Sequence, residues 1–224
     1  MKPVSESLPR RLPRGRHALS RDELERVQRA RLCAAMAEVM AEKGYVATSV
    51  ADVLARSGVS RQTFYQVFDS KLDCFMTAFD FASDILTRRL METVGADEHG
   101  VLAPEAASDP LERFERVFTA YLDALATELP YTRLFLIEVY AAGPAAIRRR
   151  SRQQAATATL LANLMGVTAE SGRFTCQMIV TATSTMVTNA VADNDLTALR
   201  AVGPPVIDHV RALWKAGAFG HEGG

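Results

Sequence analysis

Hydrophobic residues recur every three to four positions along most of this chain, which is the spacing of amphipathic helices. An early example is the series Leu32, Ala35, Met36, Val39 and Met40. Such a stripe lets a helix bury one face while its opposite face stays polar. The sequence shows no alternating strand pattern and no internal repeat. It therefore predicts an all-α fold.

Capping residues and helix breakers divide the pattern into about nine helices. Ser20 with Glu23, and Ser49 with Asp52, have the spacing of capping boxes. The predicted helices cover approximately residues 20–42, 50–56, 61–68, 71–93, 110–128, 130–139, 144–164, 169–191 and 195–215. A surface loop is expected over residues 95–107, which mix Gly, Pro, Asp and Ala.

The most informative stretch is residues 48–75, which predict two short helices joined by a tight turn and followed at once by a third. Gly58 supplies the turn, because a residue just past a helix end often needs a positive φ. The second short helix presents a polar face with few carboxylates, made of Arg61, Gln62, Thr63, Tyr65 and Gln66. A short helix of this kind fits the DNA major groove. The stretch therefore predicts a DNA-reading helix-turn-helix.

The residues of this unit divide into those that read bases and those that position the protein. Arg61, Gln62 and Gln66 are the expected base readers, since arginine can bind guanine and glutamine adenine through paired hydrogen bonds. Thr63, Tyr65 and Lys71 are expected to contact phosphates, Lys71 from a helix start that also favours an anion. The set of DNA-binding candidates is completed by Thr48, Ser49 and Ser60 and by two arm residues, Arg14 and Arg16.

Residues 57–71, Ser-Gly-Val-Ser-Arg-Gln-Thr-Phe-Tyr-Gln-Val-Phe-Asp-Ser-Lys, resemble the signature of the TetR family of bacterial transcriptional regulators. The resemblance extends to Glu42-Lys43-Gly44-Tyr45 and Thr48-Ser49-Val50 and covers about residues 20–82. It implies a homodimeric repressor whose hold on DNA is released by a small molecule in the C-terminal part. It also implies backbone contacts at Thr48, Tyr65 and Lys71. Gln66 departs from the histidine often found at its position.

Charge supports this division of the chain. The net charge is zero, but residues 1–70 carry 12 Lys/Arg and 8 Asp/Glu, whereas residues 71–224 carry 14 and 18. The basic end coincides with the helix-turn-helix, as a phosphate-binding surface requires. We predict a flexible basic arm over residues 1–19, a DNA-binding domain over 20–69, and a ligand-binding and dimerisation domain over 70–224. The arm is expected to lie along the DNA backbone or in the minor groove.

In this family the C-terminal helices enclose a cavity for an effector, and a pocket needs apolar walls with a few placed polar groups. The candidate liners are Phe81, Phe114, Phe118, Tyr121, Phe135, Glu138, Met178, Thr181 and Thr185. They favour a hydrophobic effector. The hydroxyl-rich run from Thr181 to Asn189 has two interpretations, a polar pocket wall or small residues packing at a dimer interface. The last two helices carry the valines and leucines expected to build a homodimer, which would read an inverted-repeat operator.

Other classes of protein are disfavoured. Enzyme motifs such as Gly-x-Ser-x-Gly, a phosphate loop or His-Glu-x-x-His are missing, so we expect no enzyme, cofactor or metal site. Three scattered cysteines, no signal peptide and no long apolar run predict a cytoplasmic protein without a membrane span. Two alternatives to a ligand-released repressor stay open. One is a DNA-binding regulator controlled by a protein partner instead of a small molecule, and the other is an activator.

Overall fold

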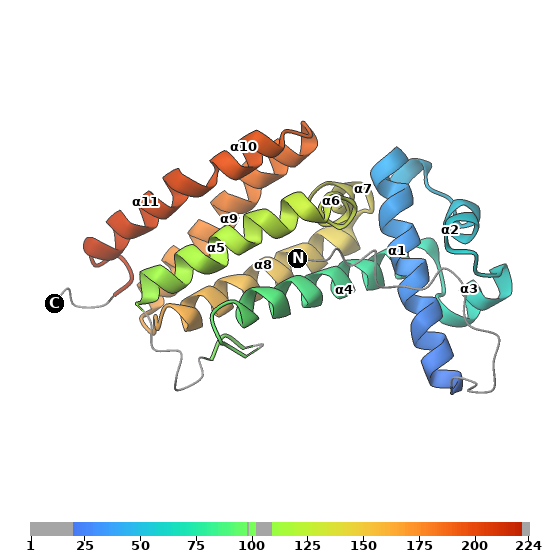
Figure 1. Ribbon diagram of the computed structural model, residues 1–224, viewed down its shortest axis with the longest axis horizontal. Coiled ribbons are helices and arrows are strands. Elements are labelled where there is room, and N and C mark those ends of the chain that lie inside the picture. Colours follow the sequence, from blue (N-terminus) through green and yellow to red (C-terminus); the bar gives the residue numbers. More distant parts are fainter. Residues whose placement is uncertain (1–19, 98, 102–108, 221–224) are drawn as a thin grey trace. The chain divides into compact units, whose positions relative to one another are not determined.

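The computed structural model describes residues 20–97, 99–101 and 109–220, and its regular elements over these ranges are helices (Figure 1). The all-α prediction is confirmed. Two compact units divide the chain. The first holds residues up to Ala82 together with Thr127–Gly143, and the second holds Ser83–Ala126 together with Pro144–Gly224. The boundary between the two units therefore falls inside the fourth helix, between Ala82 and Ser83. The predicted boundary between a DNA-binding domain and a ligand-binding domain, between residues 69 and 70, stays a prediction.

The first unit contains the predicted DNA-binding helices. Its elements are α1 (Arg21–Ala47), α2 (Val50–Ser57), α3 (Arg61–Val67), the first half of α4 (Lys71–Glu92), α6 (Leu129–Arg133), the π-helical turn η2 (Leu134–Glu138) and α7 (Val139–Ala141). The helices α2, α3, α6 and η2 all contact α1. The first unit is therefore organised around α1.

The second unit is a bundle of longer helices. It contains the rest of α4, nearly all of α5 (Pro110–Thr127), and α8 (Pro144–Leu164), α9 (Glu170–Ala192), α10 (Leu196–Ala201) and α11 (Gly203–Lys215). α8 packs along α9, and α10 contacts α9 in turn. Asp109 accepts hydrogen bonds from the amides of Leu111 and Glu112 at 2.7 and 3.3 Å, as its predicted capping role requires.

Three helices differ in detail from their predicted extents. α1 continues to Ala47, but Gly44 inside it has a φ of 78° and a ψ of 164°, so the predicted stop appears as a kink. The segment predicted as one helix over 130–139 is instead α6, η2 and α7. The helix predicted over 195–215 breaks before Gly203, because Pro204 and Pro205 lack amide hydrogens and begin a new helix.

Aromatic side chains form much of the core of the first unit. Phe64, Phe68, Phe75 and Phe79 are each at most 1% exposed. Phe79 stacks on Phe135 of η2 with ring centroids 4.6 Å apart. The predicted stripe of α1 is buried as well, with Leu32, Met36 and Met40 at most 1% exposed. This packing fixes the short helices, which are too short to be stable alone.

Candidate nucleic-acid interface

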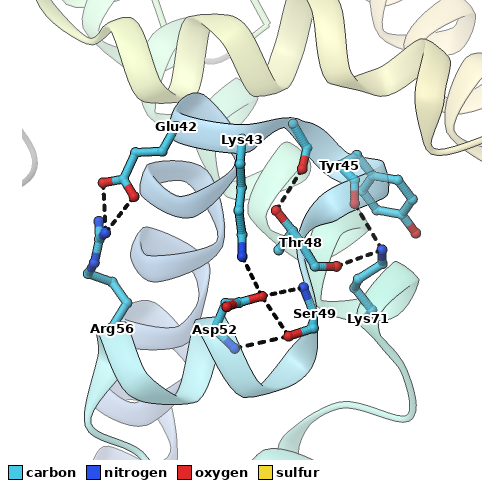
Figure 2. A network of polar contacts seen from close by, with 9 residues as sticks. Glu42, Lys43, Tyr45, Thr48, Ser49, Asp52, Arg56 and Lys71 are labelled. Atoms are coloured by element: carbon cyan, nitrogen blue, oxygen red, sulfur yellow. Dashed lines mark hydrogen bonds and ion pairs between the residues drawn. The ribbon is translucent and has the colours of Figure 1, made fainter.

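A network of polar contacts holds the turn that leads into α2 (Figure 2). Ser49 caps α2 by accepting the amide of Asp52, and the Asp52 carboxylate accepts the amide of Ser49 at 2.8 Å. Lys43 of α1 adds an ion pair to Asp52 at 2.7 Å. The hydrogen bonds from Lys43 and Ser49 hold the pKa of the Asp52 carboxyl well below its usual range. The capping box predicted for residues 49–52 is confirmed.

Two further carboxylates of α1 hold the other end of α2. Arg56 lies 3.0 Å from a carboxylate oxygen of Glu38 and 2.6 Å from one of Glu42. Both Glu42 oxygens are within reach of the same guanidinium nitrogen, at 2.6 and 2.8 Å (Figure 2). These pairs tie α2 to α1. Arg56 is thus used in building the unit.

The turn between α2 and α3 has the predicted geometry. Gly58 adopts a left-handed conformation with φ 65° and ψ 24°, and its amide donates to the carbonyl of Leu54 at 2.9 Å. Ser60 then caps α3 by accepting the amide of Thr63 at 3.1 Å. Gly58 therefore ends α2, and Ser60 begins α3 two residues later.

α3 presents a polar face and buries the opposite one. Phe64 and Val67 are buried, whereas Arg61, Gln62 and Gln66 are exposed. Tyr65 is 51% exposed, with its ring edge against Phe64 at 5.2 Å between centroids. Thr63 is half-buried, and its hydroxyl lies 2.9 Å from that of Ser60. The side chains expected to meet DNA thus share the solvent side of one short helix.

Cationic side chains cap the C-terminal ends of the three N-terminal helices, a feature that the sequence reading missed. Arg31 donates to the carbonyl of Ser57 at the end of α2, at 2.5 Å. Arg29 donates to the carbonyl of Val67 at the end of α3, at 3.2 Å, and lies over the ring of Phe68. Carbonyls at a helix end lack helical partners and carry partial negative charge, so cations stabilise them.

Lys71 performs the same task for α1. Its ammonium donates to the carbonyls of Tyr45 and Thr48, both at 2.9 Å, and lies 4.0 Å from the centroid of the Tyr45 ring (Figure 2). Burial lowers the pKa of Lys71. Thr48 is 2% exposed, and its hydroxyl donates to the carbonyl of Gly44 at 2.7 Å. Both residues therefore have structural partners, and their phosphate contacts stay predictions.

The predicted effector-binding residues are distributed over both units. Phe81, Phe135 and Glu138 belong to the first. Phe135 stacks on Phe79, and the Glu138 carboxylate accepts the amide of Tyr45 at 2.7 Å. The other six belong to the second unit: Phe114, Phe118, Tyr121, Met178, Thr181 and Thr185. The candidates do not all lie within one unit.

Within the second unit the candidates fall into two groups that differ in burial. Phe114 and Phe118 of α5 are buried and stack at 5.4 Å, and Tyr121 continues the series at 6.3 Å from Phe118. Burial raises the pKa of Tyr121 to about 12. Met178, Thr181 and Thr185 lie instead on the exposed side of α9. The aromatic series and the polar run are therefore separate features.

The remaining predictions concern the N-terminal arm, metal sites and membrane spans. Arg14 and Arg16 lie outside the described residues. In the described ranges, no three His, Cys, Asp or Glu side chains gather in a way that could hold a metal ion. No helix in those ranges is both long enough and apolar enough to span a membrane.

Comparison with known proteins agrees with the geometry of the first unit. Residues 32–77 match the model of the bacterial regulatory proteins of the tetR family. These residues contain most of α1, all of α2 and α3, and the start of α4. No curated protein matches the chain.

Several solved structures share the fold. A TetR-family transcriptional regulator from Pectobacterium atrosepticum is 22% identical, with a TM-score of 0.58 over 88% of this chain and 97% of that one. A transcriptional regulator from Rhodococcus sp. Rha1 is 21% identical, with a TM-score of 0.60 over 82% and 96%. FadR from Bacillus subtilis, solved with stearoyl-CoA, is 17% identical, with a TM-score of 0.61 over 80% and 95%.

The matched segment contains the helix-turn-helix whose polar face is described above, and the fold match extends over both units. The sequence signature at residues 57–71 lies inside the matched range. Residues 32–77 therefore form a DNA-binding domain of the tetR-family type, and the chain as a whole has the fold of TetR-family transcriptional regulators.

Proposed function

We propose that this chain is a homodimeric repressor that reads an inverted-repeat operator through α3 and leaves it when a small hydrophobic effector binds the second unit. The observation that carries the proposal is the exposed polar face of α3. Arg61, Gln62 and Gln66 project from a helix whose opposite side is anchored by the fully buried Phe64. A rigid helix with exposed donors at its N-terminal end is what base reading in the major groove requires.

The roles of single residues follow from their exposure. Arg61 and Gln62 begin α3 and are assigned to base edges, with Gln66 one turn further on. Tyr65, Thr63, Ser60 and Ser49 are assigned to phosphates, which fix the register of the protein on DNA. Each good paired contact to a base discriminates by about 1–3 kcal/mol.

The dimer is assigned to the exposed face of α9. Phe174, Met178 and Met186 are 62, 57 and 49% exposed, and they follow each other in steps of four or eight residues. Residues so spaced share one side of a helix, and a row of large exposed apolar side chains marks an interaction site. The exposure of Thr181 and Thr185 on this side favours the interface interpretation of the polar run.

A closed twofold dimer presents two copies of α3. They must be about 34 Å apart, or a multiple of that, to enter successive major grooves on one side of B-DNA. The operator is therefore an inverted repeat. An effector releases the dimer if it binds the conformation with the wrong separation more tightly than the DNA-bound one.

The effector is assigned to the second unit, beside the aromatic series of α5. Phe114, Phe118 and Tyr121 supply the apolar surface and one hydroxyl, the combination expected of a pocket for a largely apolar ligand. The stearoyl-CoA bound by Bacillus subtilis FadR, which shares the fold, makes long-chain acyl compounds the first probes to try.

The test is DNase footprinting of the full chain on the DNA that flanks its own gene. The expected result is a protected inverted repeat that is lost in Arg61→Ala and Tyr65→Ala and weakens with salt. Arg152→Ala, which removes one exposed arginine from α8, is the charge-matched control and should protect the repeat like the wild type. Protection that is equal in all four proteins would contradict the role of α3. Unchanged protection on adding acyl compounds would exclude that effector class.

A further inference from the structure

The segment Thr127–Gly143 has an unusual place in the chain. It packs in the first unit with the DNA-binding helices, but the residues before and after it, Ala126 and Pro144, belong to the second unit. The chain thus passes from the second unit into the first and back again within 17 residues. The segment is therefore joined covalently to the second unit at both of its ends.

Glu138, at the end of the π-helical turn in this segment, binds the C-terminal end of α1. Its carboxylate accepts the backbone amide of Tyr45 at 2.7 Å, and the residue is 8% exposed. The carbonyl of Tyr45 is held by Lys71, whose ammonium donates to it at 2.9 Å. The backbone of Tyr45 is therefore held by an anion at its amide and by a cation at its carbonyl.

The local sequence explains why an outside acceptor is used here. Gly44 is non-helical, so it interrupts the ladder of backbone hydrogen bonds just before Tyr45. Glycine is favoured at this position by its φ of 78°, and the Glu138 carboxylate lies close by, since a Cβ at Gly44 would be in van der Waals contact with one of its oxygens at 3.4 Å. The kink and the carboxylate form one structural element.

The held turn leads directly into the DNA-binding helices. The amide of Thr48 donates to the carbonyl of Tyr45 at 3.2 Å, and Ser49 caps α2. The orientation of the Tyr45 backbone therefore sets where α2 begins. The position of α2 in turn sets that of α3, because both pack on α1 across the turn at Gly58.

We propose that Glu138 is a positioning residue that holds the turn between α1 and α2 in the form that binds DNA, and that a change in the second unit weakens DNA binding by withdrawing it. This rests on the proposed function and specifies its regulation. A π-helical turn is a less regular conformation than an α-helix and is frequent at functional sites, so it is a suitable place for such a movement. An effector need only favour the state in which Glu138 has left Tyr45.

The test compares Glu138→Gln and Glu138→Ala with the wild type in the full chain. Glutamine keeps an acceptor oxygen but loses the charge, and charge-assisted hydrogen bonds are the stronger ones. Glu112→Gln, which removes an exposed carboxylate from α5 in the second unit, is the matched control. The measurements are amide hydrogen exchange at Tyr45, operator affinity by fluorescence anisotropy, and the fraction of protein active in stoichiometric titration.

The expected result is a graded effect. Exchange at Tyr45 accelerates and operator affinity falls about tenfold in Glu138→Gln and further in Glu138→Ala, the loss expected for a hydrogen bond to a charged group. The active fraction and the dependence of affinity on salt stay those of the wild type, because no phosphate contact is removed. Glu112→Gln leaves the exchange at Tyr45 unchanged.

Two results would overturn the proposal: wild-type operator affinity in Glu138→Ala, or wild-type exchange at Tyr45 in that variant. A fall in apparent affinity that only follows a fall in the active fraction would show a purely structural role and overturn it too. If the wild-type chain selects no operator, the proposed function fails and the DNA step of this inference with it. The exchange rate at Tyr45 would still decide whether Glu138 holds the turn.

Discussion

At the scale of single residues, Lys71 is the first residue of one helix, and its side chain caps the C-terminal end of another. It is the first residue of α4, and its ammonium binds two carbonyls just beyond the kink of α1. The sequence signature suggested a phosphate contact, whereas the structure shows a helix-capping partner for the same charge. An ammonium has three donors, so the two roles are compatible. Their contributions can be separated by experiment.

Lys71→Met should destabilise the folded protein by about 1–3 kcal/mol, because two carbonyls lose a charged donor. Urea unfolding measures the loss, and Lys215→Met at the exposed end of α11 is the control. If Lys71 also binds a phosphate, the slope of log affinity against log salt falls by about one in magnitude. A wild-type unfolding midpoint would show that the two carbonyls do not depend on this lysine.

A second prediction at this scale concerns pH. The pKa of Asp52 in the folded protein lies below its unfolded value of about 3.9, so its stabilisation is present above about pH 4 and is lost as the pH falls further. Asp52→Asn should therefore lower the urea midpoint at pH 7 and have a smaller effect at pH 2, because the stabilisation fades only as the pH approaches the lowered pKa of the folded carboxyl. Asp193→Asn, at the exposed end of α9, is the control. An equal effect of Asp52→Asn at both pH values would contradict the role of its charge.

At the scale of elements, the kink of α1 shows how one residue joins two parts of the fold. The sequence pattern placed a helix end before Gly44, and the backbone does leave the helical region there. The pattern could not predict that Glu138 accepts the amide of Tyr45 next to this kink, since Glu138 is 93 residues away along the chain. The π-helical form of residues 134–138 was equally invisible, because no local spacing of residues distinguishes it from an α-helical turn.

Gly44→Ala tests the kink. An L residue at φ 78° and ψ 164° is strained by about 1–3 kcal/mol, and the new methyl group would be in van der Waals contact with the Glu138 carboxylate. Gly166→Ala has a similar φ of 69° but a Cβ that would meet nothing, so it measures the backbone strain alone. We expect both variants to be less stable in urea, and only Gly44→Ala to accelerate amide exchange at Tyr45. Equal exchange in the two variants would contradict the link between the kink and Glu138.

At the scale of the whole molecule, the dimer depends on which faces of the last helices remain free. Val187, Val191, Leu199 and Val210 are at most 2% exposed, so these apolar residues of the predicted interface helices pack inside the chain. The exposed row on α9 contains Phe174 and Met178 instead. Periodicity shows that a helix has an apolar face but not which molecule covers it.

Met178→Glu should convert the dimer to a monomer, since twofold symmetry repeats the buried charge in both copies of the interface. Sedimentation equilibrium measures the mass, and Val101→Glu, at another strongly exposed apolar residue, is the control. The monomeric variant should also lose affinity for the inverted repeat while keeping its helical circular dichroism. A dimeric Met178→Glu protein would place the interface elsewhere.

The sequence by itself determined the helical class, most helix ends, the helix-turn-helix and its family, because these depend on contacts between residues a few positions apart. Capping serines, Gly58 and the spacing of Val53, Phe64 and Phe68 act locally, so they can be read in order. Only the tertiary structure decided that Glu138 binds Tyr45, that Arg29, Arg31 and Lys71 cap neighbouring helices, and which face of α9 stays exposed. These contacts join residues distant in the chain, and their partners are chosen by how the helices pack.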